Sequence, residues 1–182
     1  MKKWFVLSLT AVLFLATHSL INAQEINTQK DPRPFNTVED MIAKAITAEL
    51  PGWKRTSVPP MNRDGLDNFR YDVIIDQWSS EEGNVKVALL LYQSEDDAKS
   101  KFEEFKAGVK ANEQLQDVDN EAFAWGISES IALRRGSYSV YISSIAKHVQ
   151  NDDVFSDKRP GEEAKLNKLF AKIIAKALKD IR

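Results

Sequence analysis

The chain of 182 residues carries 25 basic and 27 acidic residues, a formal net charge of −2, and no cysteine. A chain without cysteine has no disulfide, no redox-active thiol and no cysteine-ligated metal, so packing alone must hold its fold together. The near balance of charge argues against a nucleic-acid partner, which a basic surface would attract.

The first 23 residues have the order of a secretory signal peptide. Lys2 and Lys3 precede the apolar run 4–16, and a polar segment then ends at the small residue Ala23. This is the pattern of a cleaved signal, whereas a membrane-spanning helix needs about 20 apolar residues. We therefore expect removal of 1–23 and a soluble product in the periplasm or outside the cell, with an uncleaved anchor as the alternative. The short Lys-Lys leader favours a bacterial source.

The next part of the chain is predicted to begin with a leader and a helix. Residues 24–36 carry two prolines and no periodicity, which indicates a flexible leader. Apolar residues then recur at helical spacing over 38–50, and Thr37 stands where a capping box would begin. A Pro-Gly pair ends the pattern. The following segment, 53–69, is rich in turn-forming residues and is predicted as a loop.

A β-hairpin is predicted over 70–92. Alternation in its first half is typical of a half-buried strand, with Tyr71, Val73 and Ile75 on one side. The returning strand is apolar on both faces in its second half, which favours a central place in a sheet.

Three consecutive acids, at 95–97, directly follow the hairpin and could belong to a catalytic or metal site. Ser94, however, occupies the position of a helix N-cap, and Asp97 three residues later completes a short capping box. Acids in the first turn also meet the positive end of the helix dipole. We therefore predict a helix over 95–110 and no functional site at the triplet.

Short strands are predicted within 121–146, the last two joined by a tight turn that contains Gly136. A polar linker over 147–161 then leads to a final helix over 162–181 with an unbroken apolar stripe. Hairpins outnumber crossovers, which predicts one α+β domain over 37–182, with the helices packed on an antiparallel sheet of about five strands. The element order alone resembles secreted α/β sandwich modules of photosystem-associated and Ran-binding families, and no residue motif carries this likeness.

A serine hydrolase is the first chemistry to test. The segment 126–130 comes within one residue of the G-x-S-x-G elbow, but Ser130 replaces its closing glycine. The motif also needs a strand-to-helix turn, whereas Ser128 lies between two predicted strands. Only one histidine, His148, would remain after signal removal. We predict a turn here and no catalytic residue.

Metal and carboxylate sites also lack complete patterns. The segment 117–121 resembles the first half of a calcium loop, but its sixth position is Ala122 instead of glycine. Asp72 and Asp76 are four apart on a strand, about 13 Å, which is too far for a glycosidase pair. We expect them on the polar outer face of the hairpin. No metal ligand and no cofactor is predicted.

Aromatic side chains on the predicted strands, with two arginines at a neighbouring turn, form the remaining candidate site. Such a group would suit a small apolar or anionic ligand, although core packing would also use aromatic residues. The candidate ligand-binding residues are Trp78, Tyr92, Trp125, Arg134, Arg135 and Tyr141.

The leading hypothesis is an exported, non-enzymatic module that binds a protein or a small apolar or anionic ligand. The first alternative is an enzyme that uses only carboxylates, lysine or tyrosine. The second is a membrane-surface protein that uses 162–182, where lysines lie opposite the apolar stripe of an amphipathic helix.

Overall fold

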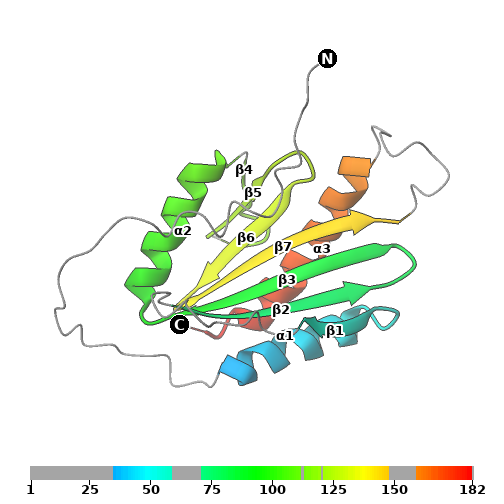
Figure 1. Ribbon diagram of the computed structural model, residues 1–182, viewed down its shortest axis with the longest axis horizontal. Helices are drawn as coiled ribbons and strands as arrows, with labels where there is room; N and C mark the ends of the chain where they lie inside the picture. Colours follow the sequence, from blue (N-terminus) through cyan, green and yellow to red (C-terminus); the bar gives the residue numbers. More distant parts are fainter. Residues whose placement is uncertain (1–34, 59–70, 112, 120, 148–158, 182) are drawn as a thin grey trace, which may run out of the picture.

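The computed structural model describes residues 35–58, 71–111, 113–119, 121–147 and 159–181. The predicted signal peptide, most of the leader and most of the linker before the last helix lie outside these ranges. The described elements follow one another along the chain (Figure 1) as α1 (Phe35–Glu49), β1 (Lys54–Val58), β2 (Tyr71–Ser79), β3 (Gly83–Tyr92), α2 (Glu95–Val109), β4 (Glu113–Gln114), β5 (Ala122–Trp125), β6 (Ser130–Arg135), β7 (Tyr138–Ala146) and α3 (Arg159–Leu178).

All seven strands form one antiparallel sheet in the order β1-β2-β3-β7-β6-β5-β4. The predicted α+β fold is confirmed, and β3 is central as expected. The prediction of about five strands missed β1 and β4. Strand β1 lies in the segment predicted as a loop, because its sequence KRTSV has no apolar alternation and its place is set by backbone pairing with β2.

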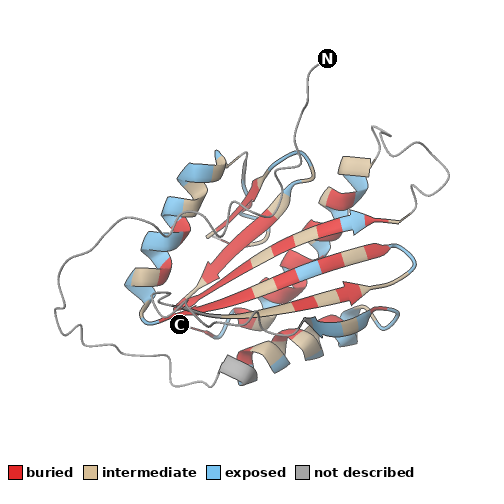
Figure 2. Ribbon diagram, viewed as in Figure 1, coloured by how far each residue is buried: buried red, intermediate tan, exposed pale blue. Residues whose placement is uncertain are grey.

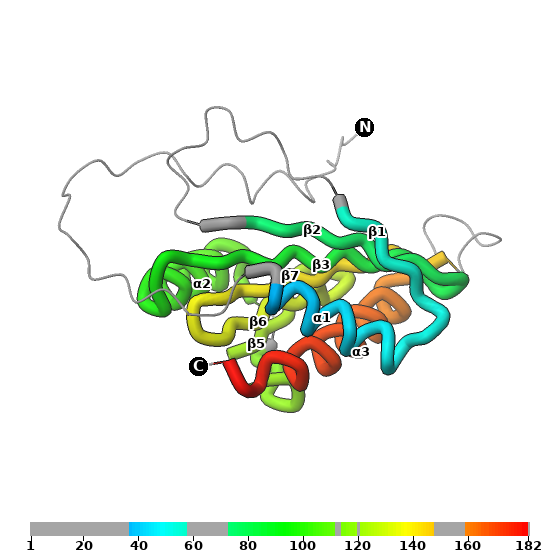
Figure 3. Tube along the Cα trace, turned by 90° about the horizontal axis from the view of Figure 1, so that it is seen from below, coloured from blue at the N-terminus to red at the C-terminus, as the bar shows by residue number. Residues whose placement is uncertain are grey.

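Helices cover both faces of the sheet unequally. Helices α1 and α3 pack side by side on one face (Figure 3), which we call the two-helix face. Helix α2 packs on the opposite face, which we call the one-helix face. This inequality decides where the candidate site lies.

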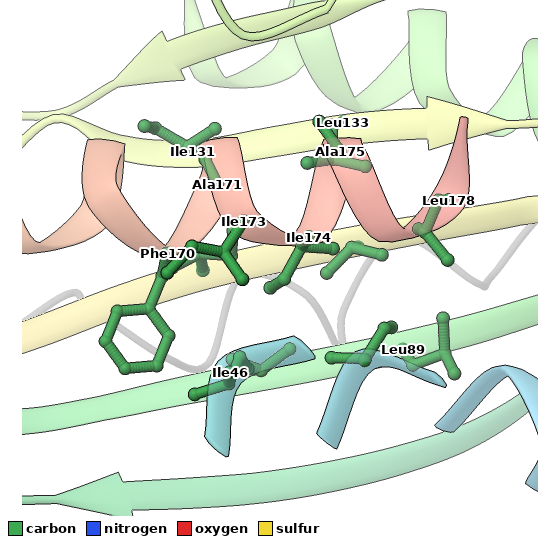
Figure 4. Packing of buried hydrophobic residues seen from close by; sticks show 14 of the residues in the cluster. Ile46, Leu89, Ile131, Leu133, Phe170, Ala171, Ile173, Ile174, Ala175 and Leu178 are labelled. Carbon is green, nitrogen blue, oxygen red and sulfur yellow. The ribbon is translucent and has the colours of Figure 1, made fainter. Parts of the chain in front are cut away.

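The two-helix face holds the main core. Phe170 of α3 is fully buried and meets Trp53 edge-on, with ring centroids 4.9 Å apart, and Trp78 of β2 at 6.5 Å. Figure 4 shows Ile46 of α1 and Ile174 of α3 in the same layer, between the helices and the strands. The apolar stripe predicted for the last helix is therefore used for packing on the sheet.

The first and last helices, α1 and α3, begin at earlier residues than predicted. Helix α3 starts at Arg159 because proline is tolerated in a first helical turn and Arg159 pairs with Glu163 one turn later, at 2.9 Å. Helix α1 starts at Phe35, so Thr37 lies inside the helix and is not its cap.

The orientation of β2 is the reverse of the prediction. Asp76 and Trp78 point into the two-helix face, and Val73 packs on the one-helix face. Asp76 is buried there because Arg55 of β1 pairs with it at 2.9 Å and the Ser57 hydroxyl donates to it at 3.2 Å. A buried carboxylate is stable only with such partners. The expectation that Asp76 lies on a polar outer face is wrong.

The N-terminus of α2 has the predicted capping box. The Ser94 hydroxyl oxygen accepts a hydrogen bond from the Asp97 backbone N–H at 3.1 Å, and the hydroxyl donates to the Asp97 carboxylate at 3.0 Å. Glu95 and Asp96 occupy the first turn. The three acids are thus accounted for by the start of the helix, which ends at a left-handed Lys110.

Replacing Ser94 with alanine should lower the free energy of unfolding by about 1 kcal/mol, because the Asp97 N–H loses its acceptor. Urea unfolding monitored by circular dichroism measures the change. Ser94→Thr keeps the hydroxyl and should lose less than Ser94→Ala. Equal stability of the alanine variant and the wild type would mean that the cap contributes nothing.

In the described part of the chain, no helix is long and apolar enough to cross a membrane.

Candidate ligand-binding face

The strand register arranges the side chains of the one-helix face in rows. One row is apolar and runs from β2 to β5 through Ile75, Ala88, Tyr141, Ala132 and Phe123. The next row is polar and holds Gln77, Lys86 and Ser143. Because alternate residues of a strand share a face, both rows look toward the side on which α2 lies.

Helix α2 covers only part of this face. Its Phe105 ring stands edge-on to Trp125 at 5.2 Å and to Tyr141 at 4.9 Å, and Phe102 lies 5.0 Å from Phe123. This aromatic cluster fixes α2 above β5, β6 and the neighbouring part of β7, away from β1 at the opposite edge (Figure 1).

The rest of the one-helix face, over β2, the first part of β3 and the end of β7, has no helix packed on it among the described elements, and α2 borders it through Phe105 at Tyr141 and Ala98 at Leu90. Its apolar side chains are half-buried, except for Ile145, which is 53% exposed, and its lysine is exposed. Figure 2 shows the resulting mixture of burial along these strands. We call this surface the open half-face; its residues are Val73, Ile75, Gln77, Lys86, Ala88, Tyr141, Ser143 and Ile145.

The charge of the open half-face is positive. Lys86 lies in its polar row, and Lys54 of the edge strand β1 points to the same side. The register of the described strands places no acid of β1, β3 or β7 on this side, and Asp76 of β2 lies on the opposite face. The Lys86 ammonium makes no ion pair with any described residue.

The six predicted ligand-binding residues divide between the two faces. Trp78 lies in the main core of the two-helix face, and Arg135 pairs there with Asp119 at 2.7 Å. The other four lie on the one-helix face, where Tyr92 is buried and Trp125 and Tyr141 are half-buried. The structure therefore does not bring all six into one site.

Arg134, the fourth of these residues, is buried, and its positive charge is balanced by acids of the chain. Its guanidinium forms a fork with Glu121, lies 3.3 Å from Glu95 and donates to the Gly136 carbonyl at 2.7 Å. Burial opposes its charge, but the hydrogen bonds to Glu121 and Glu95 outweigh burial and raise the pKa of Arg134. Arg134 thus anchors the start of α2 to the sheet. Lys86 lies on the same face without an ion pair to any described residue, and sequence reasoning missed it although the predicted hairpin register could have placed it beside Ala88.

Ser128 lies in the β5–β6 turn, as predicted, and contributes to its anchoring. Its hydroxyl donates a hydrogen bond to the buried carboxylate of Glu163, and this carboxylate also accepts a hydrogen bond from the Arg159 guanidinium. The Asn167 amide donates to the carbonyls of Ser128 and Glu129 at 2.9 and 3.2 Å. These contacts hold the turn on α3. The histidine that a triad would need lies outside the described residues.

The acids of 117–121 are held by cations of the chain itself. The Asp117 carboxylate lies 3.1 Å from the Lys168 ammonium and 3.0 Å from the Lys172 ammonium. The hydrogen bond from Lys172, and then the one from Lys168, lower the pKa of the Asp117 carboxyl. Asp119 pairs with Arg135. Within the described ranges, no cluster of three or more potential metal-ligating side chains occurs.

The final helix was considered above as an amphipathic helix that could lie on a membrane surface, but its apolar side chains pack inside the protein. Its apolar stripe is buried in the main core, and four of its lysines pair with acids elsewhere in the chain or one turn away. These lysines belong to the surface of a core helix.

Comparisons of this chain with protein-family models, with curated proteins and with solved structures found no match. The open half-face is therefore judged on its own geometry.

Proposed function

We propose that the protein is an exported, non-enzymatic binding module that holds an apolar or amphiphilic group on the open half-face. The observation that carries this proposal is the part of the apolar row formed by Ile75, Ala88 and Tyr141, which among the described elements α2 covers only at its Tyr141 end. An antiparallel sheet often leaves one face to solvent, and that face is then polar, so apolar side chains exposed on it typically mark a binding site. The signal-like segment 1–23 supports the exported part of the proposal.

The surface around this row is built to be rigid. Its back is the main core under α1 and α3, and its flank is α2, which is fixed by the aromatic cluster and by Arg134. A site preformed in this way binds without the entropy cost of ordering its own side chains.

Binding of the uncharged dye N-phenyl-1-naphthylamine tests the proposal. Purified protein should raise the fluorescence of the dye saturably, because the dye leaves water for the apolar row. Ala88→Phe fills the middle of the row and should weaken binding by roughly tenfold, the equivalent of about 1.4 kcal/mol.

Ala107→Phe is the matched control, since it adds the same ring on the exposed side of α2. The control should bind the dye as the wild type does. Circular dichroism establishes that both variants are folded. Absence of saturable binding by the wild type, or equal binding by both folded variants, would contradict the proposed site.

A further inference from the structure

The open half-face has an apolar end and a cationic end along a single strand. We infer that its ligand is a soluble anionic amphiphile, such as a medium-chain carboxylate, with the anionic head at Lys86 and the tail along β3 over Ala88 toward Leu90. The inference rests on the proposed function and adds the chemical class and the orientation of the ligand.

The polarity of β3 changes in one direction along this face. Asn84 and Lys86 lie toward the β2–β3 turn, Ala88 follows, and Leu90 is buried beside Ala98 of α2. Alternate residues of a strand are about 6.7 Å apart, so Lys86 and Leu90 are about 13 Å apart along the strand. An extended alkyl chain with an anionic head matches both the length and the polarity of this path.

The cross-strand neighbours provide apolar contacts on both sides of the path. Ala88 has a small side chain and stands between Ile75 of β2 and Tyr141 of β7. Directly opposite side chains in antiparallel strands have Cβ atoms about 5 Å apart, so a tail over Ala88 contacts both larger neighbours. These apolar side chains are half-buried.

Charge complementarity selects an anion as the head group. Among the described residues, Lys86 forms no ion pair with a carboxylate, and Lys54 adds a second positive charge on the same side of the sheet. Arg134, by contrast, already forms ion pairs with Glu121 and Glu95. A carboxylate beside Lys86 gains a charge-assisted hydrogen bond, a neutral head gains much less, and a cationic head is repelled.

A free amphiphile fits this surface better than a bilayer does. Insertion into a bilayer needs apolar side chains that project from the protein surface. The apolar row is half-buried in the sheet, so it can receive one chain that comes to it.

The test compares three amphiphiles with the same alkyl tail, each below its micelle concentration: dodecanoate, dodecyl maltoside and dodecyltrimethylammonium. Displacement of N-phenyl-1-naphthylamine and isothermal titration calorimetry should rank dodecanoate first and the cation last. Lys86→Gln should weaken dodecanoate binding by roughly tenfold, as expected for loss of one hydrogen bond to a charged group, and leave dodecyl maltoside binding unchanged.

Lys44→Gln is the matched control, because Lys44 is an exposed lysine of α1, on the other face of the sheet. It should bind dodecanoate as the wild type does. Lys86→Glu should place dodecyltrimethylammonium ahead of dodecanoate, since the sign of the charge is reversed. Both Lys86 variants replace an exposed side chain, so their folding should be intact.

Three results would overturn the inference. They are equal affinity for the three amphiphiles, dodecanoate binding that Lys86→Gln leaves intact, and binding to phosphatidylglycerol vesicles without binding of monomeric dodecanoate. In each case, dye binding that Ala88→Phe weakens would leave the proposed function standing. Failure of the dye and of all three amphiphiles would overturn both proposals.

Discussion

Replacing Phe170 with alanine should lower the free energy of unfolding by about 3–5 kcal/mol, the usual cost of removing a fully buried phenylalanine. The ring joins α3 to Trp53, which precedes β1, and to Trp78 of β2, with no exposed surface. Its removal leaves a cavity where three elements meet, and two aromatic edges lose their partner. Urea unfolding followed by tryptophan fluorescence measures the loss.

Leu169→Ala is the control, because Leu169 is the preceding residue of α3 and is 39% exposed. Its substitution should cost less than about 1 kcal/mol. Similar small losses for Phe170→Ala and Leu169→Ala would mean that α3 does not close the two-helix face. The rigid support behind the open half-face would then be in doubt.

Replacing Arg134 with alanine should lower the free energy of unfolding by about 3 kcal/mol, at the lower end of the cost of breaking a buried ion pair. The lower end applies because the Glu121 side chain is 42% exposed and can be hydrated once its partner is gone. The variant also loses the bond to the Gly136 carbonyl and the contact with Glu95. Thermal and urea unfolding both report the change.

Two comparisons separate this effect from a general charge effect. Arg134→Lys keeps the charge but not the fork, and should recover only part of the stability. Lys101→Ala breaks an exposed pair with Glu104 and should cost less than about 0.5 kcal/mol. If Arg134→Ala were no more destabilising than Lys101→Ala, Arg134 would not anchor α2.

The local sequence was sufficient for elements whose determinants are neighbours in the chain. The capping box of α2 depends on Ser94 and Asp97, and the β6–β7 turn on Gly136, which has a positive φ of 52°. The apolar stripe of α3 likewise predicted both the helix and its packing. Periodicity and turn chemistry are local properties, so they can be read without the fold.

Features set by distant residues could not be predicted in this way. The orientation of β2 depends on Arg55, which belongs to a strand with no apolar pattern, and the sheet edge at β4 is two residues long. A period of two predicts that the faces of a strand differ but not which face meets the larger core. This reversal is what puts Val73 and Ile75 on the open half-face.

The candidate site was predicted only in part for the same reason. Trp125 and Tyr141 lie on the one-helix face, but Arg134 and Arg135 are paired with acids that lie elsewhere in the sequence, and Arg135 lies on the opposite face. Lys86 was not predicted as a binding residue, because a single lysine in a strand carries no distinctive sequence pattern. Its importance comes from the cross-strand register, which makes it the charged neighbour of apolar side chains that no described helix covers at Ile75 and Ala88.

A titration of the ¹⁵N-labelled protein with dodecanoate, followed by heteronuclear NMR, tests most directly whether the open half-face is the binding surface. The account predicts saturable shifts of backbone amides in 73–77, 86–90 and 139–145, with α1 and α3 unchanged. Saturable shifts confined to α1 and α3, with those three segments unchanged, would contradict it.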